Sequence, residues 1–182
     1  MSKKNTNLCE TNLHVALNAA PDFTGAFTNE VMLLQHMIAD ELSAPVEHDD
    51  DMNYSSAQKL VIWLDKGCHF VSPRDAKAAF RLVDLVSSRG RFFTIVSLSI
   101  SASTAGWKEK GLEKPSRYWT LIAKEDLPNE ARNIQKKVES IMESNHYELV
   151  RGSVLHQEAA GHWTKLDGRP ATVFEVLFSE EY

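Results

Sequence analysis

The chain has 182 residues, two cysteines, a hydrophobic fraction of 43% and a net charge of −5. These values are ordinary for a globular protein that can bury a core, and no apolar run approaches the roughly 20 residues that cross a bilayer. Asparagines and a histidine interrupt the weakly apolar N-terminal patch, so we expect no signal peptide. Two cysteines without such a segment fit a reducing compartment, and we expect a cytoplasmic protein that does not bind membranes.

Charge is unevenly distributed along the chain. Residues 21–65 contain nine acidic residues and one lysine, whereas residues 66–137 contain fourteen basic and seven acidic residues. The acidic part therefore either packs over the basic part of the same chain or faces a basic partner. The negative net charge makes nucleic acid an unlikely main partner.

The N-terminal third is predicted to contain one clear helix. Residues 1–27 show no clean period and are predicted to form an arm. Apolar residues then recur every three or four positions from a capping residue, Thr28, until Pro45, which predicts a helix there. The following residues 46–58, VEHDDDMNYSSAQ, are acidic and polar and are predicted to form an exposed loop. We expect the arm, helix and loop to occupy residues 1–57.

The rest of the chain is predicted to form a single α+β domain, residues 58–182. Its predicted strands cover residues 59–65, 91–103, 117–125 and 148–156, and its predicted helices cover residues 72–90 and 126–147. This order is that of a ferredoxin-like βαββαβ fold with a C-terminal β-hairpin around Asp167-Gly168. Its right-handed crossovers would place both helices on one face of an antiparallel sheet and leave the other face open.

Serines alternate with apolar residues along the longest predicted strand. Phe92, Thr94, Val96 and Leu98 share one face and are expected beneath the helices. Ser97, Ser99 and Ser101 would then line the open face. That face would be wet, covered by the helix of residues 29–42, or pressed against a second copy in a homodimer.

Motifs for catalysis or cofactor binding are absent. The loop at residues 103–117 contains glycines and lysines but lacks the spacing of a phosphate-binding loop. The segment HQEAAGH, residues 156–162, lacks a third recognisable metal ligand. We therefore expect no metal site, no cofactor and no recognisable catalytic residue, although active sites also assemble from residues distant in sequence and an enzyme is not excluded.

These observations favour a non-enzymatic binding or regulatory protein, such as an immunity or accessory factor. Its acidic run, Glu47, Asp49, Asp50 and Asp51, would contact a basic protein partner. The alternative is a small-molecule-binding module or enzyme that uses the open sheet face and the 103–117 loop. The residues that would serve this alternative are Ser97, Ser99, Ser101, Trp63, Trp107, Lys108 and Arg117.

Overall fold

The computed structural model describes residues 3–51, 55–63, 80–103, 116–121 and 127–179. For residues 3–10, 63, 80, 99–103 and 116–120 it describes the backbone but not the side chains. Among the helices described, none combines the length and the apolar character that crossing a membrane requires.

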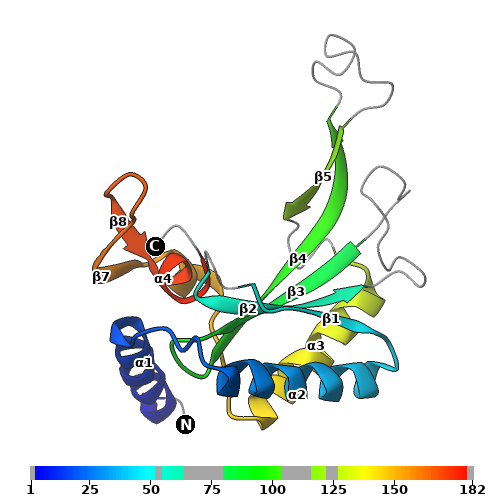
Figure 1. Ribbon diagram of the computed structural model, residues 1–182, viewed down its shortest axis with the longest axis horizontal. Coiled ribbons are helices and arrows are strands. Elements are labelled where there is room, and N and C mark those ends of the chain that lie inside the picture. Colours follow the sequence, from blue (N-terminus) through cyan, green and yellow to red (C-terminus); the bar gives the residue numbers. More distant parts are fainter. Residues whose placement is uncertain (1–2, 52–54, 64–79, 104–115, 122–126, 180–182) are drawn as a thin grey trace.

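A six-stranded sheet forms the centre of the protein (Figure 1). Five strands follow one another across it in chain order and pair antiparallel: β1 (Val46–Asp49), β2 (Ala57–Trp63), β3 (Phe80–Ser87), β4 (Phe92–Ser103) and β5 (Ser116–Leu121). The short β6 (Glu148–Leu149) pairs parallel with the beginning of β4. The protein is therefore α+β, as expected, but its sequential strand order is not that of the ferredoxin-like fold.

The difference arises at β3, where we predicted a helix over residues 72–90. Residues 80–87 form a strand that pairs antiparallel with both β2 and β4. Both faces of this central strand are covered, so its side chains form a nearly continuous apolar run instead of an alternating pattern. The predicted helix start around Ser72 lies outside the described residues.

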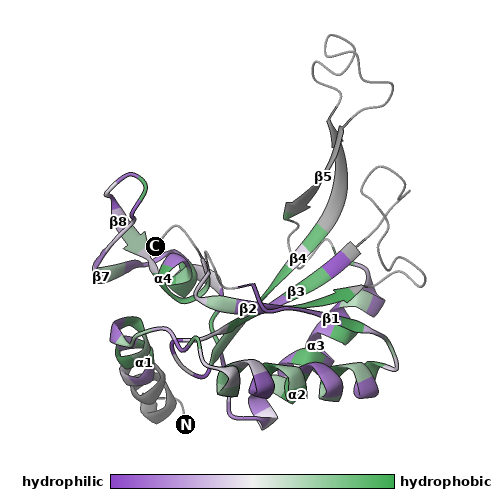
Figure 2. Ribbon diagram, in the orientation of Figure 1, coloured by the Kyte–Doolittle hydropathy of each residue, from purple (hydrophilic) through white to green (hydrophobic). Residues whose placement is uncertain are grey.

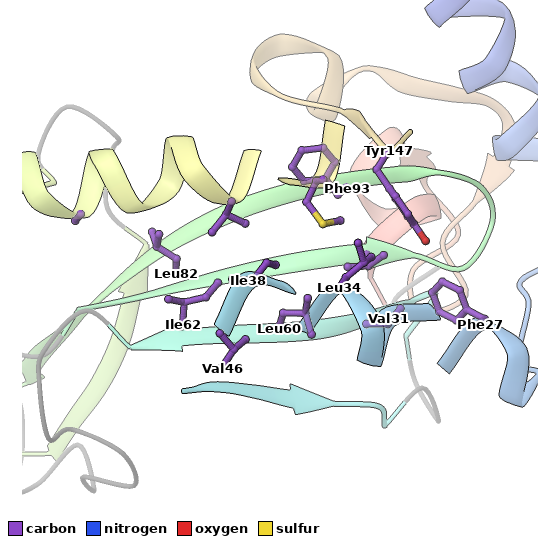
Figure 3. Packing of buried hydrophobic residues seen from close by; sticks show 14 of the residues in the cluster. Phe27, Val31, Leu34, Ile38, Val46, Leu60, Ile62, Leu82, Phe93 and Tyr147 are labelled. Atoms are coloured by element: carbon purple, nitrogen blue, oxygen red, sulfur yellow. The ribbon is translucent and has the colours of Figure 1, made fainter. Parts of the chain in front are cut away.

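Two helices cover the first face of the sheet. They are α2 (Gly25–Leu42) and α3 (Asn129–Ser144), and both were predicted, although α2 begins three residues before Thr28. Figure 3 shows α2 side chains, among them Val31, Leu34 and Ile38, directed toward Leu60 and Ile62 of β2. On this face Ser97 is only 7% exposed and pairs with the buried Leu82.

The second face carries its own core, so helices lie on both faces of the sheet rather than on one. This core joins α1 (Lys3–Asn18) and α4 (Val173–Phe178) to side chains of β2, β3 and β4. Phe92 belongs to it, and Val96 and Leu98 pack against it. The predicted face was therefore wrong for Phe92, Val96 and Leu98, which do not lie beneath α3. Ser97 lies on the face that α2 and α3 cover, so of the three alternatives for its face the structure shows cover by the helix of residues 29–42.

The N-terminal arm and the acidic loop also have regular structure. Residues 3–18 of the predicted arm form α1, which buries Ala16 and Leu17. Residues 46–49 of the predicted loop form β1, which pairs with β2 as an edge strand of the sheet. The domain boundary between residues 57 and 58 stays a prediction.

The predicted C-terminal hairpin is present in part. The 3₁₀ helix η2 (Gly152–His156), where we predicted a strand, precedes β7 (Glu158–Trp163), which pairs with β8 (Pro170–Thr172) across a turn that contains Asp167 and Gly168. Gly168 has a φ of +67°, a conformation that glycine adopts without strain. The residues after β8, predicted as strand, form the helix α4.

A capping box explains why the chain turns into a helix at α4. The Thr172 hydroxyl accepts from the Glu175 backbone N–H at 3.3 Å, and the Glu175 carboxylate accepts from the Thr172 backbone N–H at 2.8 Å. Arg169 also pairs with this carboxylate. The hydrogen bond from Arg169 and those from Thr172 lower the pKa of Glu175 from 4.5 to about 2, against the opposing effect of burial.

Replacing Thr172 by Ala should lower the free energy of unfolding by about 1 kcal/mol, because the cap is lost.

The lowered pKa of Glu175 stabilises the fold fully above pH 4.5. This contribution is lost as the pH falls from that value toward 2. Urea unfolding between pH 6 and pH 2 checks both points, and Glu175→Gln should lose this part of the pH dependence. An identical acid slope in the wild type and in Glu175→Gln would contradict the assignment.

Candidate functional site

The outer surface of α2 is unusually apolar for an exposed helix face. Its inner stripe, Phe27, Val31, Leu34 and Ile38, already supplies the residues that the core needs. On the outer side Met32 is 40%, Leu33 65% and Met37 45% exposed, although neither packing nor helix propensity requires apolar residues there. Exposed apolar residues that gather in this way are typical of protein-binding surfaces.

The edge strand β1 runs alongside α2. The Gln35 side-chain amide donates to the Val46 carbonyl oxygen at 2.6 Å. Near the other end of β1, Gln58 of β2 donates to the Thr28 hydroxyl at 2.8 Å and also bonds the His48 imidazole. Met32 lies one helical turn from both Thr28 and Gln35, so it faces the side of α2 that β1 follows.

Acidic residues lie at both ends of the exposed apolar residues. Asp40 is exposed at the C-terminal end of α2, and Asp50 and Asp51 are exposed just beyond β1. Figure 2 shows hydrophobic and hydrophilic residues side by side along α2 and a hydrophilic segment after β1. We use the name α2–β1 surface for Met32, Leu33, Met37 and Asp40 on the outer side of α2 together with Asp50 and Asp51 just beyond β1. Met32 lies on the β1 side of the helix, and Leu33 and Met37 lie farther around it.

The segment that carries this surface contains no lysine or arginine. Residues 25–51 hold seven acidic residues, namely Glu30, Asp40, Glu41, Glu47, Asp49, Asp50 and Asp51. Basic residues from elsewhere reach three of them: Arg91 lies 2.8 Å from Glu30, Lys137 2.9 Å from Glu41 and Lys59 3.2 Å from Asp49. The acidic third of the chain therefore does pack partly against the basic middle, and the carboxylates of Asp40, Asp50 and Asp51 are exposed to solvent.

The four predicted partner-binding residues have different surroundings. Glu47 points to the second face of the sheet, where it is half-buried and interacts electrostatically with Arg81. Burial lowers the pKa of Arg81, and the charge of Glu47 opposes that effect. Asp49 pairs with Lys59, so Asp50 and Asp51 are the two of the four that are most open to a partner.

The structure describes the side chain of only one of the seven residues predicted for the small-molecule alternative, Ser97. Ser97 is buried on the face of the sheet that α2 and α3 cover, so it does not line an open surface. Ser99, Ser101, Trp63 and Arg117 belong to strands whose side chains at these positions are not described. Trp107 and Lys108 lie outside the described residues.

Sequence reasoning did not find the contacts among Glu30, Arg91 and Tyr147. Arg91 packs its guanidinium carbon 5.3 Å from the centre of the Tyr147 ring and also pairs with Glu30, which ties α2 to the start of β4. Burial and the Glu30 carboxylate raise the pKa of Tyr147, and Arg91 opposes them. Glu30 on α2, Arg91 before β4 and Tyr147 before β6 are far apart in the sequence, and nothing in the sequence indicated that they meet.

Within the part of the chain that the structure describes, no three His, Cys, Asp or Glu side chains gather as a metal-binding group. No protein-family model, curated protein or solved structure matches this chain.

Proposed function

We propose that this protein is a non-enzymatic binding or regulatory protein that recognises a basic, amphipathic helix of another protein through the α2–β1 surface. One observation carries the proposal: three exposed apolar side chains lie on a segment of 27 residues, 25–51, that has seven acids and no lysine or arginine. An apolar helix face would cover Met32, Leu33 and Met37, and its lysines or arginines would meet Asp40, Asp50 and Asp51.

The rigidity of the surface supports this proposal. The ion pairs of Glu30 with Arg91 and of Glu41 with Lys137 hold the two ends of α2 to the rest of the protein. Val31 and Ile38 on its inner side are fully buried. The backbone of α2 therefore loses little conformational freedom when a partner binds, which favours affinity. An immunity or accessory factor of the cytoplasm is the kind of protein that would act in this way.

The test uses a fluorescent synthetic helix of roughly 18 residues, five turns, with leucines on one face and lysines on the other. The protein should bind it saturably, and should bind the same peptide with glutamates for lysines much more weakly. Leu33→Glu should weaken binding of the lysine peptide by about tenfold, because an apolar contact of about 1.4 kcal/mol is lost. Fluorescence anisotropy measures each affinity.

Matched variants elsewhere on the protein control for general effects. Leu166 is 81% exposed on the turn between β7 and β8, so Leu166→Glu adds the same charge without touching the α2–β1 surface. Asp50→Lys with Asp51→Lys should weaken binding and flatten its salt dependence, whereas Glu158→Lys should do neither. Equal effects of Leu33→Glu and Leu166→Glu, or equal binding of both peptides, would refute the proposal.

A further inference from the structure

His36 lies on the outer side of α2, among the exposed apolar residues of the α2–β1 surface. Successive residues of an α-helix are about 100° apart around its axis, so His36 projects between Met32 and Leu33. It follows these two residues by four and three positions and precedes Asp40 by four, and such spacings place side chains on adjacent turns of one helix face. The imidazole is exposed, as are its three neighbours. A partner that covers Met32, Leu33 and Met37 therefore also covers this imidazole.

An imidazole can occupy this position in two charge states. Histidine is the side chain that ordinarily changes its charge between about pH 5 and pH 8. The neutral ring is weakly polar, and an apolar helix face can cover it while its nitrogens bond to water at the edge. The protonated ring carries a full positive charge, which is costly to cover with apolar groups. The two states of His36 therefore present different surfaces to the same partner.

Basic side chains that reach α2 from other elements lie away from His36. Arg91 pairs with Glu30 at 2.8 Å, and Lys137 of α3 pairs with Glu41 at 2.9 Å. These two acids lie about 120° and 140° around the helix axis from His36, so their partners do not approach the imidazole from the outer side. A proton on His36 therefore adds a positive charge where neither pair supplies one.

The charged and titratable groups on the outer side are mostly acids. Asp40 lies one helical turn beyond His36, and Asp50 and Asp51 are exposed just beyond β1. On β1 itself, the His48 imidazole is held at 2.8 Å by the Gln58 side chain. A proton on His36 thus offsets part of the negative charge that would attract a basic partner.

We infer that His36 makes binding at the α2–β1 surface depend on pH: a basic amphipathic helix binds when the imidazole is neutral and dissociates when it is protonated. This inference rests on the proposed function, because it requires a partner that is both apolar and basic. The protonated imidazole repels the lysines of the partner, and its charge must also be covered. Because linkage is reciprocal, binding of the helix must in turn displace the proton.

The lysine peptide described above tests this inference by fluorescence anisotropy at pH 7.5 and at pH 5.5. Its lysines keep their charge throughout this range, so the peptide itself does not change. The wild-type protein should bind it about fivefold more weakly at pH 5.5. His36→Gln keeps a polar side chain of good helix propensity but takes up no proton, so it should lose most of this difference.

His14→Gln is the matched control, because it removes an exposed histidine from α1, outside the α2–β1 surface. This variant should keep the pH dependence of the wild type. Absence of binding at pH 7.5 would refute the proposed function and this inference together. Binding at pH 7.5 that is equally strong at pH 5.5, or an equal pH dependence in the wild type and in His36→Gln, would overturn the inference alone.

Discussion

Replacing Ile38 by Ala should lower the free energy of unfolding by about 2–5 kcal/mol. Ile38 is fully buried at the centre of the inner stripe of α2, against the first face of the sheet. The substitution removes apolar atoms from a packed site and leaves a cavity, and the better helix propensity of alanine offsets only a few tenths of a kcal/mol. Urea denaturation followed by circular dichroism measures the change.

Leu33→Ala is the matched control for this prediction. Leu33 lies on the same helix but is 65% exposed, so its truncation should change the free energy of unfolding by less than about 0.5 kcal/mol. The two variants together test whether α2 buries the face that the structure shows. A similar loss of stability in both variants would mean that the outer face of α2 is also buried.

Replacing Asp84 by Val should stabilise the protein by about 1–3 kcal/mol at neutral pH, because a buried polar group without hydrogen bonds is removed. Asp84 is 0% exposed on β3, and neither of its carboxyl oxygens has a hydrogen-bond partner within the described residues. Its cross-strand neighbours are the apolar Leu60 and Ile95, and valine suits such a strand position. Thermal and urea unfolding measure the gain.

The pH dependence of Asp84 has a definite sign. Burial raises its pKa well above the ordinary value of 3.8, so the folded protein retains a proton that the unfolded chain releases. The contribution of Asp84 to stability should therefore be largest below pH 3.8 and should fall as the pH rises from that value toward the raised pKa. Asp84→Asn cannot ionise and should not show this fall. A destabilised Asp84→Val, or an unchanged pH profile in Asp84→Asn, would contradict the assignment.

Periodicity predicted the helices that cover the first face but not the connectivity of the sheet. α2 and α3 have apolar residues every three or four positions and polar residues elsewhere, which is the pattern of a helix with one buried side. The segment LVDLV of β3 is buried on both sides, and its spacing fits a helix as well as a strand. Because we predicted a helix where β3 lies, the predicted topology had a helical crossover between β2 and β4 instead of an antiparallel strand between them.

The candidate sites were only partly predictable for a related reason. A run of acids such as Asp49, Asp50 and Asp51 is visible in the sequence, and so is the excess of apolar residues on α2. The surface pocket beside α1 joins residues near positions 12–16, 89–92 and 146–148, which only the tertiary structure brings together. The left-handed backbone at His146 likewise gives no signal in the sequence.

The position of β3 between the two cores has a dynamic consequence. Leu82 and Val86 belong to the core under α2 and α3, whereas Val83 and Leu85 belong to the core under α1 and α4. β3 therefore separates two hydrophobic cores, one beneath α2 and α3 and the other beneath α1 and α4. We therefore expect α2 and α3 to open from the sheet independently of α1 and α4, and we expect adjacent residues of β3 to report on these two openings separately in hydrogen exchange.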